Sequence, residues 1–67
     1  MIVARNIKRL RKKKGISQQQ LADALGFWQT NITAWETGRN EPSLFSLILL
    51  ADFFEVTLDE LCKKEIE

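Results

Sequence analysis

The decisive stretch of this chain is Ser17–Gly38, SQQQLADALGFWQTNITAWETG, which predicts two short helices joined by a tight turn. Ser17 is a good N-cap, and Gln20 three positions later completes a capping box that would begin the first helix. Gly26 would end that helix, because glycine adopts the left-handed backbone conformation of a helix C-terminus without a Cβ penalty. Gly38 is placed to end the second helix in the same way.

Apolar residues at helical spacing predict one buried face for each of these helices. The apolar positions are Leu21, Ala22 and Leu25 in the first helix, and Trp28, Ile32 and Trp35 in the second. Two helices this short, with so little chain between them, must cross steeply, and Ala22 is small where their backbones would come closest. This is the helix-turn-helix arrangement, over about residues 18–37, and its second helix commonly enters the major groove of DNA.

The chain closely resembles the lambda-repressor-like, Cro/cI-type (XRE) helix-turn-helix family. Six motifs occur in the family's order and spacing: Gly15-Ile16-Ser17-Gln18, Leu21-Ala22, Leu25-Gly26, Ile32-Thr33, Trp35-Glu36 with Gly38, and Pro42-Ser43-Leu44. The match continues through residues 56–61, so it covers nearly the whole chain. The resemblance implies an all-α fold of five short helices in one domain, residues 1–67. It also implies sequence-specific binding of double-stranded DNA and regulation of transcription.

Composition argues against several other classes of protein. The single cysteine, Cys62, cannot form an intrachain disulfide, and the chain contains no histidine and no Cys/Asp/Glu cluster at metal-ligand spacing. We therefore expect no metal, no cofactor and no enzymatic activity. The longest apolar run, 47–51, is far shorter than the roughly 20 residues of a membrane span. The chain begins MIVARNIKRLRKKK, which is no signal peptide, so we expect a cytoplasmic protein without a membrane partner.

Charge is divided unevenly along the chain. Residues 1–40 carry eight Lys or Arg and two acids, a balance of +6, whereas residues 41–67 carry two lysines and seven acids, a balance of −5. The basic part contains the helix-turn-helix, as a surface attracted to phosphate would require. The alternative is an uneven charge distribution that arose by chance.

The second helix of the motif, about Gln29–Thr37, is the one expected to read sequence. At 100° per residue, Ile32, Trp35 and Trp28 point into the core, and the opposite face is short and uncharged. The predicted base contacts on that face are Gln29, Thr30, Thr33 and Ala34. Glutamine can bond adenine through N6 and N7, threonine can bond several base edges, and methyl groups can pack on thymine. The alternative is a small polar face with no partner.

Four residues are predicted to contact phosphates: Gln18, Thr37, Arg39 and Asn40. Gln18 lies in the first turn of its helix, where free N–H groups and the helix dipole favour an anion, and the family's matching glutamine touches the DNA backbone. Arg39 resembles the family's basic phosphate contact after the Gly38 turn, and Asn40 could donate from the same loop. The alternatives are an exposed glutamine without a role and ordinary loop chemistry.

A first helix is predicted over Met1–Lys14. Its buried stripe comprises Val3, Ile7 and Leu10. In the family, an arginine four residues before the position of Gly15 pairs with the glutamate of the Trp-Glu dipeptide. The resemblance therefore implies a structural ion pair between Arg11 and Glu36, which would connect the first helix to the third. The alternative is that both charges are exposed and unpaired.

Two further helices are predicted after the motif. Ser43 caps a fourth helix that ends near Phe54, and Thr57 with Glu60 forms a capping box that opens a fifth. The predicted core stripe of the fourth helix is Leu44, Leu47, Ile48, Ala51 and Phe54. Its second apolar stripe is Phe45, Leu49 and Phe53. Cys62 is expected to be a small buried hydrophobe.

A helix with two apolar faces is either fully buried or has a partner. We expect a homodimer on a near-palindromic operator, with an interface drawn from Phe45, Leu49, Phe53, Leu58 and Ile66. One alternative is that this stripe is covered within the chain. Another is that the protein is an antitoxin or other protein-interaction module that uses the Phe45, Leu49 and Phe53 face.

The chain departs from the family at two helix ends. Trp28 stands where the family usually has Ser or Thr, and an indole cannot cap the third helix with an oxygen, which would cost ~1 kcal/mol. We expect Trp28 to pack in the core; the alternative is a ring directed toward the sugar–phosphate backbone. Glu55 stands where the family often has the terminating glycine, so that turn is expected to be strained or differently shaped.

Overall fold

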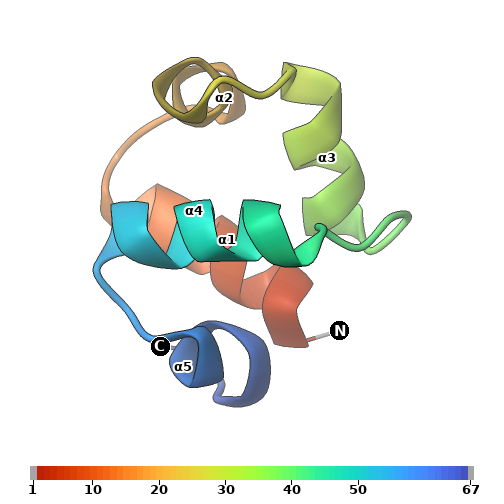
Figure 1. The fold of residues 1–67 in the computed structure, drawn as a ribbon. Coiled ribbons are helices and arrows are strands. Elements are labelled where there is room, and N and C mark those ends of the chain that lie inside the picture. The colour runs from red at the N-terminus through yellow and green to blue at the C-terminus, as the bar shows by residue number, and fades with distance from the viewer. Residues whose placement is uncertain (1, 67) are drawn as a thin grey trace.

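The computed structural model describes residues 2–66, and within them the chain forms five α-helices and no strand. The helices are α1 (Ile2–Lys13), α2 (Gln18–Leu25), α3 (Gln29–Thr37), α4 (Leu44–Phe54) and α5 (Leu58–Lys63). α2 and α3 lie at one end of the molecule and α5 at the other, with α1 and α4 between them (Figure 1). The prediction of an all-α fold with five helices is confirmed. Met1, the predicted first residue of the first helix, lies outside the described residues. No helix within residues 2–66 combines the length and apolar character needed to span a membrane.

The predicted capping chemistry sets the ends of α2. The Ser17 hydroxyl accepts from the backbone N–H of Gln20 at 3.0 Å, and the Gln20 side chain accepts from the backbone N–H of Ser17 at 2.8 Å. Gly26 ends α2 in the left-handed conformation, with a φ of 77°. Two donors that the first turn of α2 would otherwise leave unpaired are thereby satisfied, so these few residues are sufficient to start and stop the helix.

Each helix contributes one large, fully buried apolar side chain to the core. These are Ile7, Leu21, Ile32, Leu50 and Leu61. Trp35 completes the packing under α3, with the Phe27 ring meeting it edge-on at 4.9 Å between centroids. Because each helix contributes to the same cluster, truncating any one of these side chains removes contacts between several helices, at a typical cost of about 2–5 kcal/mol.

The buried face of α4 differs from the predicted one. Leu44 and Ile48, predicted as core, are exposed, whereas Leu50, absent from both predicted stripes, is fully buried. Nine of the 11 residues of α4 are apolar, so periodicity along the helix cannot distinguish its faces. The small, buried Ser46 helps α4 to approach the core, with its hydroxyl 3.0 Å from that of Ser43.

Asn6 connects α1 to the C-terminal segment and was not identified from the sequence. Its side chain is fully buried, and its amide nitrogen donates to the carbonyls of Leu61 at 2.8 Å and Lys64 at 2.6 Å. Its amide oxygen accepts from the backbone N–H of Ile66 at 2.9 Å. These carbonyls include the last ones of α5, which have no partner within the helix. Asn6 therefore satisfies the end of α5 and holds it against α1.

The prediction that Trp28 packs in the core is wrong, since the residue is 79% exposed. Trp28 is the N-cap of α3 and has an extended backbone, with φ −89° and ψ 147°. It therefore does not follow the helical rotation on which the prediction rested, and the neighbouring Phe27 packs against the core instead. As expected, no side-chain oxygen caps this helix; Asn31 accepts from the Trp28 N–H at 3.0 Å and supplies only half of a capping box.

The turn after α4 keeps the left-handed conformation without a glycine. Glu55 has a φ of 57°, and among residues 2–66 it is the one non-glycine residue with a positive φ. Its N–H donates to the carbonyls of Ala51 and Asp52. This position is therefore strained, as the sequence predicted, at a cost of about 1–2 kcal/mol.

We predict that Trp28→Ser stabilises the protein. A serine hydroxyl at this extended position can accept from a backbone N–H of the first turn of α3, which should raise the free energy of unfolding by about 0.5–1 kcal/mol. Urea unfolding followed by circular dichroism measures the change. Trp28→Ala is the matched control, since it removes the indole without adding an acceptor. Equal stability of the two variants would contradict the prediction.

Candidate nucleic-acid interface

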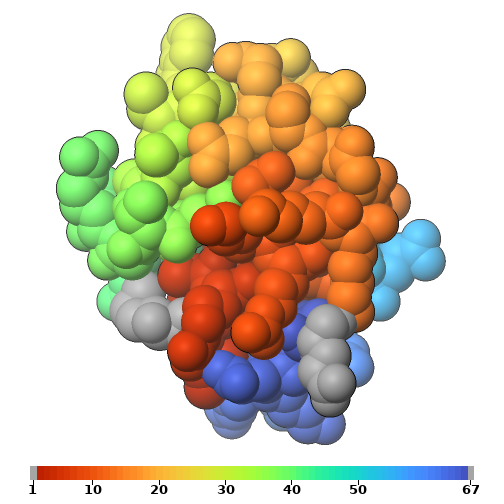
Figure 2. Space-filling model, turned by 180° about the vertical axis from the view of Figure 1, so that it is seen from behind, coloured from red at the N-terminus to blue at the C-terminus, as the bar shows by residue number. Residues whose placement is uncertain are grey.

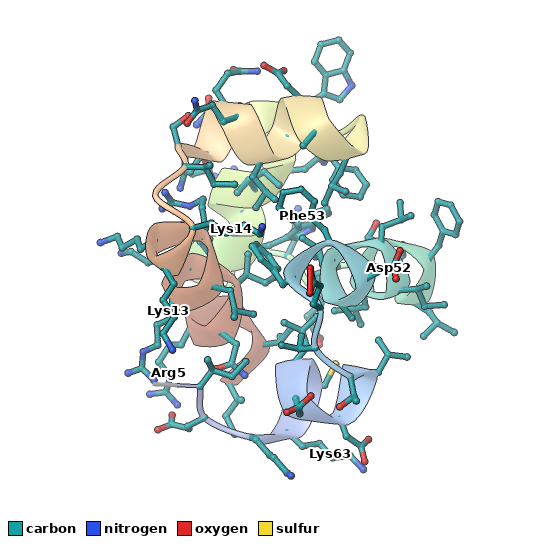
Figure 3. All side chains as sticks on the ribbon, turned by 90° about the vertical axis from the view of Figure 1, so that its left-hand side faces the viewer. Arg5, Lys13, Lys14, Asp52, Phe53 and Lys63 are labelled. Carbon is teal, nitrogen blue, oxygen red and sulfur yellow. The ribbon has the colours of Figure 1, made fainter. Side chains whose placement is uncertain are left out.

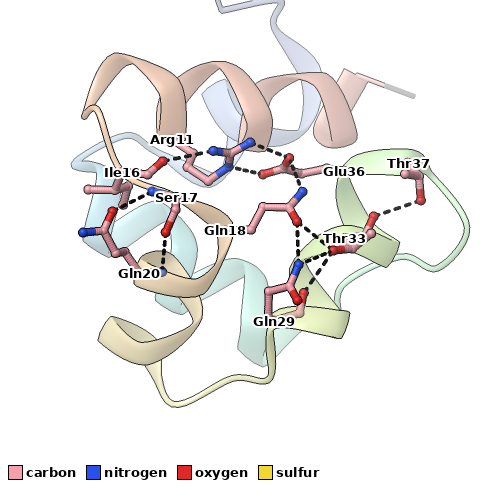
Figure 4. A network of polar contacts seen from close by, with 9 residues as sticks. All are labelled: Arg11, Ile16, Ser17, Gln18, Gln20, Gln29, Thr33, Glu36 and Thr37. Carbon is pink, nitrogen blue, oxygen red and sulfur yellow. Dashed lines mark hydrogen bonds and ion pairs between the residues drawn. The ribbon is translucent and has the colours of Figure 1, made fainter.

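A polar network joins α2 to α3 at the end of the molecule that the two helices form (Figure 4). Gln18 lies at its centre. The Gln18 amide nitrogen donates to Glu36 at 3.0 Å, and its amide oxygen accepts from the Gln29 amide nitrogen at 2.8 Å and from the Thr33 hydroxyl at 2.7 Å. The Gln29 amide nitrogen also donates to the Thr33 hydroxyl, at 3.0 Å. Gln18, predicted as a phosphate contact, therefore also positions two predicted base contacts.

Behind this network lies the ion pair between Arg11 and Glu36 that the resemblance implies. Arg11 Nε lies 2.6 Å from Glu36 Oε2, and Arg11 Nη2 donates to Oε1 at 3.0 Å, so the pair is bidentate. The third donor, Nη1, reaches the carbonyl of Ile16 at 3.0 Å. Side-chain exposure is only 11% for Arg11 and 3% for Glu36. The hydrogen bond to Glu36 raises the pKa of Arg11 above its ordinary value, although burial opposes this. The two side chains thus form a bidentate ion pair in a largely desolvated position.

The predicted recognition face is only partly available in the structure. Thr30 is exposed, while Gln29 and Thr33 are half-buried and joined through the network. Ala34 is only 4% exposed, so the prediction that its methyl group faces outward is wrong. The chain turns back after Gly38, and the N–H groups of the two following residues both donate to the Ala34 carbonyl, at 2.9 and 3.3 Å. Helical rotation alone does not account for a loop that returns to its own helix.

The other predicted phosphate contacts lie at the C-terminal end of α3. The Thr37 hydroxyl donates back to the Thr33 carbonyl at 2.9 Å. Arg39 and Asn40 follow in the loop, and both are exposed. Their backbone N–H groups bond to the Ala34 carbonyl and close the end of α3. Gln18 thus lies alongside α3, bonded to Gln29, Thr33 and Glu36, whereas the other three predicted phosphate contacts lie at the C-terminal end of α3.

Apart from the buried Arg11, the basic residues of α1 are exposed, but some are paired within the chain. Arg5 lies 2.7 Å from Glu65, and Arg9 donates to the Ile66 carbonyl at 2.9 Å. Lys14 lies 5.0 Å from the centre of the Phe53 ring. α1 crosses the back of the molecule between the α2–α3 end and the C-terminal segment (Figure 2). Its Arg5 and Lys13 lie on the side opposite Asp52 of α4 (Figure 3).

The similarity to known proteins agrees with this geometry. A model of the helix-turn-helix family matches residues 7–61. The chain belongs to this family. The predicted resemblance to Cro/cI-type regulators is confirmed, and the family consists of DNA-binding transcriptional regulators.

Two relatives of this helix-turn-helix protein come from Bacillus subtilis. The HTH-type transcriptional regulator AnsR is 46% identical over 56 residues, which cover 84% of this chain and 48% of the relative. The transcriptional regulator YqaE is 42% identical over 60 residues, covering 90% of this chain and 52% of the relative. The chain thus spans about half the length of these curated relatives.

A solved structure matches the helix-turn-helix chain over almost all of its length. The P22 c2 repressor, crystallised with a synthetic operator, superposes with a TM-score of 0.88 at 28% identity. The match covers 96% of this chain and 97% of the repressor chain. The five-helix arrangement is therefore one that is seen bound to an operator in a related protein.

Arg11→Ala should destabilise the protein by about 3–5 kcal/mol, because it leaves the Glu36 carboxylate desolvated without its cation. Urea unfolding, followed by the fluorescence of the buried Trp35, measures the loss. Arg5→Ala is the matched control: its partner Glu65 is solvent-exposed, so the loss should be below about 1 kcal/mol. Similar unfolding midpoints for both variants would mean that the Arg11 pair contributes no more than a surface pair.

Proposed function

We propose that this chain is a sequence-specific double-stranded DNA-binding domain of a cytoplasmic transcriptional regulator, and that it places α3 in the major groove. The observation that carries the proposal is the packing of α2 against α3 with an uncharged polar surface at the start of α3. Such a surface suits base edges, whereas a merely solvated helix usually carries Lys and Glu. The operator-bound P22 c2 repressor supports a repressor-like action.

Within this proposal, base reading falls to Gln29, Thr30 and Thr33. Thr30 is exposed, and the network holds Gln29 and Thr33 side by side on one face of α3. The N-terminal residues of a recognition helix commonly contact base edges, and these three lie in its first half. Ala34 is omitted because its methyl group is buried.

Phosphate binding falls to Gln18 in the first turn of α2, and to Thr37, Arg39 and Asn40 at the C-terminal end of α3. Gln18 lies in the first turn of the eight-residue α2, where the helix dipole adds positive potential. Arg39 supplies the one formal charge among the four. Phosphate contacts from the first turn of α2 and from the end of α3 would set the register of α3 in the groove, whereas the bases supply the sequence preference.

Binding should weaken as salt rises, and Arg39→Ala should reduce the slope of log K against log salt by up to about one unit, since each neutralised phosphate adds about −0.9. Fluorescence anisotropy with a labelled duplex measures the slope. Arg5→Ala removes the same charge at the end of α1 near Glu65, away from α3, and should leave the slope nearly unchanged. Equal slopes for wild type and Arg39→Ala would remove Arg39 from the interface.

We further propose that the chain binds a near-palindromic operator as a homodimer through the outer face of α4. Phe45 is 69% exposed, and the other large exposed apolar residues nearby in sequence are Leu44, Ile48 and Leu58. Leu49 is half-buried. Of the residues predicted for this interface, Phe53 and Ile66 pack against the protein's own core and are withdrawn from it. Symmetric dimers of this class read two half-sites about one DNA turn apart, which requires an interface away from α3.

Phe45→Glu should give a folded protein that is monomeric and binds a two-half-site operator more weakly and without cooperativity. Sedimentation, with and without DNA, measures assembly, and circular dichroism reports the fold. Leu50→Glu is the matched change at a fully buried position of the same helix and should unfold the chain. Unfolding of Phe45→Glu would assign the face to the core, and a wild-type protein that is monomeric even on DNA would favour a different protein partner.

A further inference from the structure

Four exposed cations form a row along the outer face of α1. They recur at intervals of three or four residues, which makes them neighbours on a helix, and they lie on the side away from the buried Ile7. The cations are Arg5, Lys8, Arg9 and Lys12, and α1 contains no acid. At 1.5 Å per residue the row is about 10 Å long, over which one DNA strand carries about three phosphates. Seen from behind, the surface of α1 continues into that of α2 and α3, the proposed DNA-binding end (Figure 2).

Residues 64–66 engage both arginines of this row. Arg5 Nη2 lies 2.7 Å from Glu65 Oε1, and Arg9 Nη1 donates to the Ile66 carbonyl at 2.9 Å. The Arg5 and Glu65 side chains are both more than half exposed, so a phosphate can reach them. A carboxylate and a carbonyl oxygen are the kind of acceptor that a phosphate oxygen also supplies to a guanidinium group. The segment and DNA would therefore compete for the same donors.

The segment keeps its place through contacts that do not involve the arginines. Asn6 Nδ2 donates to the Lys64 carbonyl at 2.6 Å, and Asn6 Oδ1 accepts from the Ile66 N–H at 2.9 Å. The Ile66 side chain packs against the core. These contacts hold the Glu65 carboxylate beside Arg5 at the high effective concentration of a tethered ligand.

We propose that residues 64–66 are a tethered competitor for DNA phosphate on the outer face of α1. Lys8 and Lys12 bind the phosphate backbone outside the groove that α3 reads, whereas the two arginines are occupied by the segment and add little. Phosphate contacts strengthen binding to every DNA sequence. Withholding two of them limits the non-specific binding that would keep the protein away from its operator. The inference rests on the proposed function, because it concerns the regulation of the same DNA-binding surface.

A double-mutant cycle between Arg5 and Glu65 tests the competition. Glu65→Gln removes the competing charge, so affinity for a random-sequence duplex should rise about two- to fivefold, and the slope of log K against log salt should steepen by up to about 0.9. Arg5→Ala should change little in the wild-type protein but should cancel the gain in the Glu65→Gln background. Lys8→Gln combined with Lys12→Gln should flatten the slope by up to about two units in either background. Fluorescence anisotropy with a labelled duplex measures each slope, and circular dichroism checks the fold.

Asp59→Asn is the matched control, because it also releases a cation, Lys63, from an exposed ion pair. That pair lies on α5, at the end of the molecule opposite α2 and α3 (Figure 1), so the slope should stay that of wild type and the affinity should rise less than about twofold. Additive effects of Arg5→Ala and Glu65→Gln, an equal gain for Asp59→Asn, or a lysine double variant with the wild-type slope would each overturn the inference. Selection from a random double-stranded DNA pool tests the proposed function separately: if wild type selects no sequence, sequence reading fails, whatever the cycle shows.

Discussion

The Arg11–Glu36 ion pair connects α1 to α3, the helix that would recognise DNA. All three guanidinium nitrogens of Arg11 donate hydrogen bonds: two to the Glu36 carboxylate and one to the carbonyl of Ile16, just before α2 begins. The pair thereby ties α1 to α3 and to the start of α2. A desolvated pair of this kind adds little stability over apolar packing, but losing one partner is costly. In this protein the pair fixes the direction of the hydrogen bonds, because the Glu36 carboxylate accepts from the Gln18 amide nitrogen and thereby orients the amides of the α2–α3 network.

At the opposite end of the molecule, the uncharged side chain of Asn6 likewise connects α1 to another part of the chain. It is buried and uses its amide to bind the carbonyls at the end of α5 and the N–H of Ile66. α5 is only six residues long, too short to be stable through its own hydrogen bonds. Its stability therefore comes from the Thr57 capping box at its start, from Asn6 at its end and from the buried Leu61. α1 is thus attached at one end to the helix-turn-helix and at the other to the C-terminal segment.

Several exposed residues lower the stability of the helix end at which they lie, or leave apolar surface in contact with water. Trp28 leaves α3 without a side-chain cap and exposes most of an indole, and Glu55 adopts a left-handed backbone conformation that glycine would adopt more easily. α4 leaves Phe45 and two neighbouring aliphatic residues exposed although its other face supplies the core. A small domain has a small free energy of unfolding. Residues that lower it are therefore more readily explained if they form a contact surface.

The sequence by itself determined the helix boundaries, because caps, left-handed glycines and apolar spacing act over four or five residues: Ser17 with Gln20, and Gly26, define α2 before any packing is considered. The family motifs also implied the Arg11–Glu36 pair. Tertiary structure alone decided which face of the almost wholly apolar α4 is buried, that Ala34 is buried, and that Phe27 rather than Trp28 enters the core. It also revealed Asn6 and the hydrogen-bond direction through Gln18. These features depend on packing between helices, on hydrogen bonds between different elements or on a non-helical backbone at a helix end, and helical periodicity carries information about none of these.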